Sequence, residues 1–238
     1  MVRAANRGSP SGRCFAMHIQ IYTMQTPEEA LAVIEAGVDY IGVTPSAIGL
    51  PGEVDIPTAR AIIDATEGRA VRVALSVESD PDAIVEMTKA VGPDVLHLCG
   101  EVGALAPSDV AALRRRLPGV RIMQAISVAG PEALETSRDY QHAVDYLILD
   151  TKAPDILGVG ASGRTHDWAI SRRIVEQSTV PVILAGGLSP ENVAEAIRAV
   201  RPWGVDSLTH TNRLLPTGGF RKDLSRVARF VAATRGAV

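Results

Sequence analysis

The chain has 238 residues, of which 46% are hydrophobic and only 4% aromatic, and this is enough apolar material for one large domain. The formal net charge of −3 provides no basic field for nucleic acid, and no apolar run approaches the roughly 20 residues that span a bilayer, so neither nucleic acid nor a membrane is an expected partner. The two cysteines, Cys14 and Cys99, form no disulfide or metal-binding pattern, so we expect a cytoplasmic protein.

The first 16 residues are polar and rich in Arg, Gly and Ser. They show no hydrophobic periodicity and lack the apolar segment of a secretory signal. We therefore expect residues 1–16 to form a disordered N-terminal extension and residues 17–238 to form the folded domain.

From residue 17 onwards, short apolar runs with strand character alternate with segments of helical periodicity. The expected strands are His18–Tyr22, Asp39–Val43, Ala70–Val77, Val95–Cys99, Val120–Val128, Val144–Thr151, Val180–Ala185 and Gly204–Leu208. The helical segments begin near Thr26, Pro57, Asp80, Pro107, Pro131, Asp167, Ser189 and Leu224. Several of these starts carry the residues that helix N-termini prefer, such as the capping box that Thr26 and Glu29 form.

Eight strand–helix units in succession imply a parallel sheet with right-handed crossovers. An open, doubly wound sheet is the competing architecture. Eight repeats, strands of similar length and little remaining chain favour closure into a single (βα)8 TIM barrel of the α/β class. In such a barrel the active site lies at the carboxyl ends of the strands, and phosphate is commonly held after strands seven and eight.

The seventh unit, Val180–Asn192, is the most informative stretch about function. Its apolar strand ends in Gly186-Gly187, and Ser189 stands where we expect the N-cap of the next helix. Glycines let a ligand approach bare backbone N–H groups, and these groups favour anions when a helix N-terminus lies beside them. A tight turn that binds nothing is the alternative, but the position after strand seven favours a phosphate site.

Four groups of motifs resemble the phosphoribosylanthranilate isomerases, which are (βα)8 enzymes of tryptophan synthesis. They are Thr26–Ala30 with Glu35–Gly42, Leu147–Thr151 with Gly160–Trp168, Leu184–Val193, and Gly204–Asp206 with Lys222-Asp223. The third is similar to the family's strand-seven turn almost letter for letter. The resemblance extends from His18 to about Phe230 and implies a ribulose-phosphate-binding barrel.

The family's reaction is an Amadori rearrangement of a phosphoribosylamine. The resemblance implies a general acid at Asp150, which ends the sixth strand. The general base of the family is a cysteine that ends strand one, but that position falls on Tyr22, whose side chain ordinarily has a pKa of about 10. The Arg that the family carries after strand two is also absent from Thr44–Asp55.

The candidate catalytic residues are Asp150, Tyr22, His97 and Cys99. Asp150 ends an apolar strand, where a charge is costly unless it is used or paired. His97 and Cys99 lie two positions apart on one strand, so their side chains face the barrel lumen together. Two of these residues have a structural alternative. The Asp150 carboxylate can bond the backbone of the following loop, and Cys99 can be a small core residue.

The candidate substrate- and phosphate-binding residues surround the expected anion site. They are Gly186, Gly187, Ser162, Gly163, Thr209, His210 and Lys152. Ser162 and Gly163 lie in a loop that closes over the site in the family, and Lys152 follows strand six. No His, Cys, Asp or Glu spacing predicts a metal site, and no cofactor is expected.

The sequence thus predicts an isomerase that acts on a small phosphorylated sugar by acid/base chemistry, or a related epimerase or lyase. One alternative is the family's own isomerase activity in tryptophan synthesis with a relocated base. Another is a barrel that binds a phosphosugar without catalysis, which the missing cysteine permits. We expect a monomer or homodimer whose partner is this small molecule.

Overall fold

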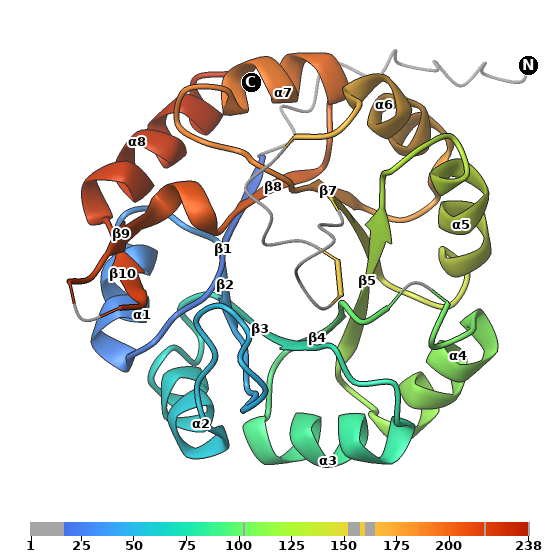
Figure 1. Ribbon diagram of the computed structural model, residues 1–238, viewed down its shortest axis with the longest axis horizontal. Helices are drawn as coiled ribbons and strands as arrows, with labels where there is room; N and C mark the ends of the chain where they lie inside the picture. Colours follow the sequence, from blue (N-terminus) through green and yellow to red (C-terminus); the bar gives the residue numbers. More distant parts are fainter. Residues whose placement is uncertain (1–16, 102, 152–157, 160–164, 217, 238) are drawn as a thin grey trace, which may run out of the picture.

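The computed structural model describes residues 17–101, 103–151, 158–159, 165–216 and 218–237. Eight parallel strands form a closed barrel in chain order, and helices surround it (Figure 1). The strands are β1 (His18–Ile21), β2 (Tyr40–Val43), β3 (Val71–Ser76), β4 (Val95–Leu98), β5 (Arg121–Ser127), β6 (Tyr146–Asp150), β7 (Val182–Leu184) and β8 (Gly204–Ser207). The helices are α1 (Pro27–Glu35), α2 (Ile56–Ala65), α3 (Pro81–Val91), α4 (Pro107–Arg116), α5 (Ala133–Tyr140), α6 (Trp168–Gln177), α7 (Val193–Val200) and α8 (Leu224–Arg235).

The barrel closes where β1 pairs in parallel with β8, so that His18 lies opposite Gly204 and Ile21 opposite Ser207. This closure confirms the (βα)8 barrel and rules out the open sheet. The expected extension, residues 1–16, lies outside the described residues.

Alternation along the strands divides the core into two layers. The outer layer lies between strands and helices and holds residues such as Ile19 and Leu98, whereas the lumen holds residues such as Val73, Met123 and Ile148. Rings from the strand starts pack in the amino end of the lumen: Tyr40 and Tyr146 contact Trp203, and His18 stacks on Trp203 with the ring centres 3.9 Å apart. The carboxyl end is therefore the side that remains for a ligand.

Five of these helices begin at a polar residue whose side chain accepts a backbone N–H of the first turn, and three of these caps, Thr26, Asp80 and Asp167, are the ones that the sequence predicts. The Thr26 hydroxyl accepts the Glu29 N–H at 3.2 Å, and the Asp55 carboxylate accepts the Thr58 N–H at 2.8 Å. Asp80, Asp167 and Asp223 cap their helices in the same way. Each cap satisfies backbone donors that the first helical turn leaves without a partner, so the local sequence decides where these helices start.

The predicted N-cap at Ser189 is wrong, because α7 begins at Val193 with Asn192 as its N-cap. The Asn192 side chain accepts the Ser189 N–H at 2.8 Å and donates to the Gly187 carbonyl at 3.0 Å. These two bonds stabilise a separate turn between strand and helix. Ser189 instead caps this turn, since its hydroxyl accepts the Glu191 N–H at 3.2 Å.

The chain after β8 contains three elements that the sequence analysis did not predict. A short 3-10 helix, η1 (Thr209–Thr211), leads into an antiparallel hairpin of β9 (Asn212–Leu214) and β10 (Phe220–Lys222). Each strand has only three residues, which is too short for a clear alternation of apolar and polar side chains.

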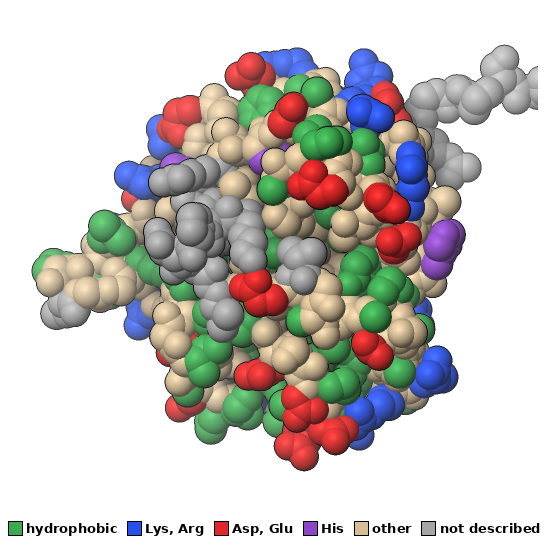
Figure 2. Space-filling view, turned by 45° about the vertical axis from the view of Figure 1, so that its right-hand side comes forward, with side chains coloured by type: hydrophobic (Ala, Val, Ile, Leu, Met, Phe, Trp, Pro, Cys, Tyr) green, Lys and Arg blue, Asp and Glu red, His purple; other side chains and the backbone are tan. Residues whose placement is uncertain are grey.

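The described surface is mixed in charge. Acidic and basic side chains lie interspersed on the face in Figure 2. Among the helices of the described part of the chain, none combines the length and apolar character needed to cross a membrane.

Truncation of Phe230 to alanine is expected to destabilise the protein by about 3–5 kcal/mol, because it leaves a cavity between α8 and the barrel. Phe230 is fully buried and is among the largest such side chains. Urea unfolding measures the loss. Leu224→Ala is the matched control on the same helix; Leu224 is 46% exposed, so its loss should stay within about 0.5 kcal/mol. Equal losses for the two variants would contradict the packing described for α8.

Candidate active site

A pocket lies at the carboxyl ends of the barrel strands. Its polar lining residues are Tyr22, Thr44, His97, Cys99, Asp150 and Asp206. Its apolar lining residues are Leu50, Pro51, Leu75, Val77, Ile148, Val159 and Leu208. The fold therefore brings the four predicted catalytic residues together in one pocket, although they come from three different strand ends.

Asp150 ends β6 and is partly buried at the pocket. Its carboxylate accepts the Thr151 N–H at 2.6 Å. Loss of water around the carboxyl raises its pKa to about 7, although the bond from Thr151 acts in the opposite direction. The group can therefore hold or release a proton near neutral pH, which is the property that acid/base catalysis requires.

Asp206 is the lining residue that the sequence analysis missed as a functional candidate. It lies on β8 and is only 6% exposed, and no group among the described residues hydrogen-bonds its Oδ1 atom. Burial raises its pKa to about 8, and the negative charge of Asp150 adds to this effect. The available signal was an acidic residue inside a short predicted strand, Gly204–Leu208, where a charge is costly unless it is used or paired.

Tyr22 and His97 form a hydrogen-bonded pair in the lumen, with 3.1 Å between the Tyr22 hydroxyl and His97 Nδ1. Burial raises the pKa of Tyr22 well above its usual range and lowers that of His97 to about 3. Both side chains are therefore neutral around pH 7. His97 Nε2 is buried and has no hydrogen-bond partner within the described part of the chain.

Cys99 directly follows β4, and its side chain lines the pocket together with that of His97. Its thiol donates a hydrogen bond to the Val159 carbonyl at 2.6 Å. Burial raises the pKa of this thiol to about 12, and the nearby charge of Asp150 adds to the rise. Cys99 thus keeps its proton at neutral pH and is not a thiolate nucleophile.

Lys222 reaches this region from the unpredicted hairpin. Its ammonium donates to Asn212 Oδ1 at 2.6 Å and also to the backbone carbonyl of Tyr22. Burial lowers its pKa to about 7, whereas the charges of Glu29 and Asp206 act to raise it. Lys222 therefore joins the end of β1 to the segment after β8.

The glycine turn after β7 has the backbone shape that the sequence indicates. Gly186 and Gly187 both lie in the left-handed region, with φ of 82° and 62°. A Cβ atom on Gly186 would lie 2.9 Å from Thr151 Oγ1, 3.0 Å from His166 Nδ1 and 3.1 Å from Asp150 Oδ1. Glycine is thus needed both for the backbone conformation and for the close approach of this turn to Asp150.

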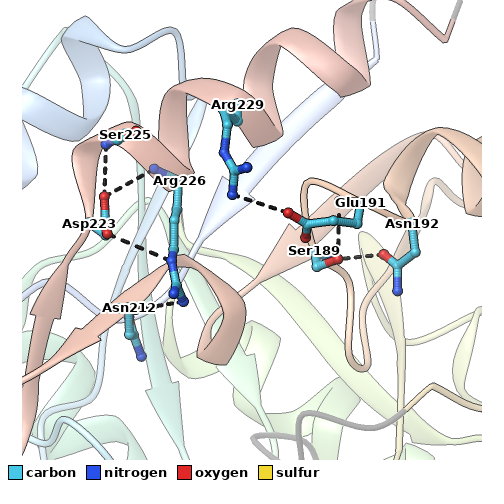
Figure 3. Close-up of polar contacts among 8 residues, drawn as sticks. All are labelled: Ser189, Glu191, Asn192, Asn212, Asp223, Ser225, Arg226 and Arg229. Carbon is cyan, nitrogen blue, oxygen red and sulfur yellow. Dashed lines mark hydrogen bonds and ion pairs between the residues drawn. The ribbon is translucent and has the colours of Figure 1, made fainter.

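Helix α8 contacts the segments that follow β7 and β8 (Figure 3). Arg229 pairs with Glu191 of the β7 turn at 3.1 Å, and Arg226 donates to the Asn212 carbonyl at 3.2 Å. The Ser207 hydroxyl, at the end of β8, also donates to the Leu188 carbonyl in the turn after β7 at 2.7 Å. These contacts hold the two loops of the expected phosphate site beside each other.

The other predicted binding residues divide into two groups. Thr209 and His210 form part of η1, directly after β8, where Thr209 is exposed and His210 is partly buried. Lys152, Ser162 and Gly163 lie outside the described residues. In the described ranges, no cluster of three or more His, Cys, Asp or Glu side chains could hold a metal ion.

The chemistry that this arrangement supports is proton transfer between a bound molecule and two carboxyl groups. Burial raises the pKa values of both carboxyls to about 7 and about 8, so near neutral pH one can be protonated while the other is ionised. Tyr22, His97 and Cys99 contribute neutral hydrogen-bonding groups around them.

Gly186→Ala is expected to destabilise the protein by about 1–3 kcal/mol more than Gly119→Ala, since only the first adds a clash to the strained backbone. Gly119 has a similar φ of 87° but has no heavy atom within 4 Å of an added Cβ atom. Chemical unfolding of both variants isolates the cost of the close approach. Equal destabilisation by the two substitutions would show that the turn does not approach Asp150 closely.

Comparison with known proteins identifies one family. The family model for N-(5'-phosphoribosyl)anthranilate (PRA) isomerase matches residues 19–209. The N-(5'-phosphoribosyl)anthranilate isomerase of Methanocella arvoryzae is 33% identical over 217 residues, covering 91% of this chain and 97% of the relative. That of Haloferax volcanii is 36% identical over 218 residues, with 90% and 92% covered. The crystal structure of phosphoribosyl anthranilate isomerase from Thermus thermophilus superposes with a TM-score of 0.75 at 25% identity, with 91% and 98% covered.

Proposed function

We propose that this protein isomerises an N-substituted amino derivative of a sugar phosphate in its pocket by acid/base catalysis. The basis is that the chain belongs to the N-(5'-phosphoribosyl)anthranilate isomerase family. The observation that carries this proposal is the pair Asp150 and Asp206, two carboxyls with raised pKa values in one pocket. The proposal is supported by the position of Asp150 beside the Gly186 turn, whose left-handed backbone is suited to phosphate.

The proposed reaction is an Amadori rearrangement. An acid gives a proton to the ring oxygen, the bond from this oxygen to C1 breaks, and C1 and the nitrogen form an iminium ion. A base then removes the proton from C2, and the resulting enol tautomerises to the ketone. The substrate and product have the same atoms, so the reaction needs no oxidant, reductant or second substrate.

The positions of the two carboxyls suggest their roles. Asp150 lies against the Gly186 turn, where the phosphate is proposed to bind. In the substrate, fewer bonds separate the phosphate from the ring oxygen than from C2, so the ring oxygen would lie nearer to Asp150. We therefore assign the acid to Asp150 and the base at C2 to Asp206. Tyr22 and Cys99 retain their protons at neutral pH, so we assign them hydrogen-bonding roles rather than the role of base. We assign to His97 Nε2 a hydrogen bond with a substrate hydroxyl.

The proposed phosphate site consists of the loops after β7 and β8. Backbone N–H groups of Gly186 and Gly187 would bind two phosphate oxygens, and Thr209 and His210 would approach from η1. The predicted contributions of Ser162, Gly163 and Lys152 stay predictions. For the whole protein we propose a cytoplasmic monomer or homodimer, which is consistent with the free, buried thiol of Cys99.

The relatives' names favour one specific form of this function, the isomerisation of N-(5'-phosphoribosyl)anthranilate itself. Rescue of a tryptophan auxotroph that lacks this isomerase tests that form. Failure of rescue, together with turnover of another sugar phosphate derivative, leaves the general proposal in place. Binding without any turnover would instead identify a barrel that recognises phosphosugars without catalysis.

A thermal-shift screen against pentose and hexose phosphates, with inorganic phosphate as control, tests the phosphate site. A ligand present at about 100 times its Kd stabilises a protein by roughly 2.7 kcal/mol. For a domain of this size that stabilisation raises the melting temperature by about 5–11 °C. If no phosphorylated compound stabilises the protein at millimolar concentration, the proposal is wrong.

A further inference from the structure

Gln20 is a polar residue inside the barrel that the proposed mechanism does not use. It lies on β1 between Ile19 and Ile21, whose side chains belong to the outer layer of the core. Alternation along the strand therefore points the Gln20 side chain into the lumen. Only 1% of its surface is exposed, so the amide is shielded from solvent.

Asp206 occupies the matching position on the neighbouring strand. In the parallel pairing that closes the barrel, Gln20 lies opposite Asp206 of β8. Asp206 follows Val205, which belongs to the outer layer, so its side chain also points into the lumen, where it lines the pocket. Adjacent strands lie about 4.8 Å apart, and two side chains in this arrangement are within reach of each other.

Both side chains bury polar atoms that form no hydrogen bond within the described part of the chain. These atoms are Nε2 and Oε1 of Gln20 and Oδ1 of Asp206. A buried polar group without a partner costs about 1–3 kcal/mol, and a methionine would fill the same space without this cost. An amide at this position therefore calls for a role, and the carboxyl opposite offers the complementary group.

The groups that face Asp206 act on its pKa in both directions. Burial raises this pKa most strongly, and the charge of Asp150 adds to the rise, whereas the Gln20 amide and the charge of Lys222 act to lower it. Tyr22 and Cys99 also lie close enough to be affected by Asp206, but both keep their protons at neutral pH. The amide thus already stabilises the ionised form of the carboxyl from the neighbouring strand.

An amide suits a carboxyl that changes its protonation state. Its NH2 group can donate to a carboxylate, and its oxygen can accept the proton of a carboxylic acid. A lysine at the same position would favour only the ionised form, and a second carboxylate only the protonated form. Rotation about the last side-chain bond of glutamine exchanges the two contacts, so the carboxyl can stay in place while its proton arrives or leaves.

We infer that Gln20 is a positioning residue for Asp206, and that its amide holds the carboxyl in one orientation toward the pocket in both the ionised and the protonated form. Gln20 is not among the described residues that line the pocket, so it acts through Asp206 rather than on the substrate. The inference rests on the proposed isomerase function, in which Asp206 is the base at C2, and adds the residue that orients this base.

NMR titration of the unmodified protein tests the contact without requiring turnover. The side-chain amide resonances of Gln20 should shift with pH, with the same midpoint as the carboxyl carbon of Asp206. Asp206→Asn should abolish this shift, whereas Asp150→Asn should retain it. An amide that does not respond to pH, or that still responds in Asp206→Asn, would overturn the inference.

Gln20→Met tests the role itself, because methionine keeps the length of the side chain and removes the amide. The titration midpoint of Asp206 should rise by about 1 pH unit, since the amide now acts to lower it. For a substrate that the protein turns over, kcat should fall by about 10-fold or more with little change in KM. Met123→Leu is the matched control: Met123 is fully buried in the lumen on β5, and its replacement should leave both values unchanged.

The two sets of measurements distinguish failure of the inference from failure of the proposed function. If the unmodified protein turns over no amino derivative of a sugar phosphate, the proposed function is wrong, and the titrations still decide whether Gln20 holds Asp206. If the protein is active but Gln20→Met changes neither the midpoint nor kcat, the inference is wrong and the proposed function stands. The titration of the unmodified protein decides the question even if Gln20→Met does not fold.

Discussion

Asp150→Asn is expected to lower kcat by about 10²–10⁴-fold, the range that a positioned proton donor contributes. Asparagine has nearly the same shape as aspartate, and its amide oxygen can still accept the Thr151 N–H that now bonds the carboxylate. The variant therefore removes the proton without removing the contact. Single-turnover kinetics with a saturating substrate separates this loss from any change in binding.

The same variant is expected to be more stable than the original protein at neutral and alkaline pH. The folded protein raises the pKa of Asp150 from 3.8 to about 7, so folding favours its protonated form. Stability is thus lost as the pH rises from about 4 to about 7, and this loss disappears when the carboxyl is replaced. Melting curves at pH 4 and pH 8 measure the effect: we expect a difference between the proteins at pH 8 and little at pH 4.

Asp80→Asn is the matched control for both effects. Asp80 is an exposed N-cap of α3, and asparagine caps helices equally well. Neither kcat nor the melting temperature should change. If Asp150→Asn retains full activity, Asp150 is not the acid. If it is less stable at pH 8, the burial of its carboxyl does not cost the stability that its raised pKa indicates.

Asp206→Asn is expected to reduce kcat by a similar factor, about 10²–10⁴-fold, and to change the shape of the pH profile. In the original protein the carboxyl pair has apparent pKa values of about 7 and about 8, so kcat/KM should form a narrow bell near these values. The base must be deprotonated, and its titration makes the acidic limb. Loss of Asp206 should therefore remove the acidic limb and leave the alkaline one.

Asp150→Asn supplies the complementary result. It should remove the alkaline limb, and it should also lower the pKa of Asp206, because the charge of Asp150 now helps to raise that pKa. Rate measurements from pH 5 to pH 10 on both variants distinguish the two carboxyls. A complete bell in Asp206→Asn would reject Asp206 as the base and return that role to the pair of Tyr22 and His97.

Much of this protein was predictable from the sequence, because the relevant physical effects are local. Apolar runs of five to nine residues, each followed by a helical period, identified the strand–helix units of the barrel. Caps such as Thr26 and Asp80 located helix starts, since they bond N–H groups only two or three positions away. Strand alternation placed His97 and Cys99 in the lumen and Leu98 outside it for the same reason.

The composition of the site depended on contacts that the sequence does not encode locally. The Tyr22 hydroxyl meets His97 across 75 residues, and Lys222 reaches the Tyr22 carbonyl across 200. Asp206 becomes a candidate base only because the closed barrel removes its water and brings it near Asp150. Local sequence therefore determined the elements and the direction of their side chains, whereas the pairing of distant groups and their proton affinities depended on the tertiary structure that buries them together.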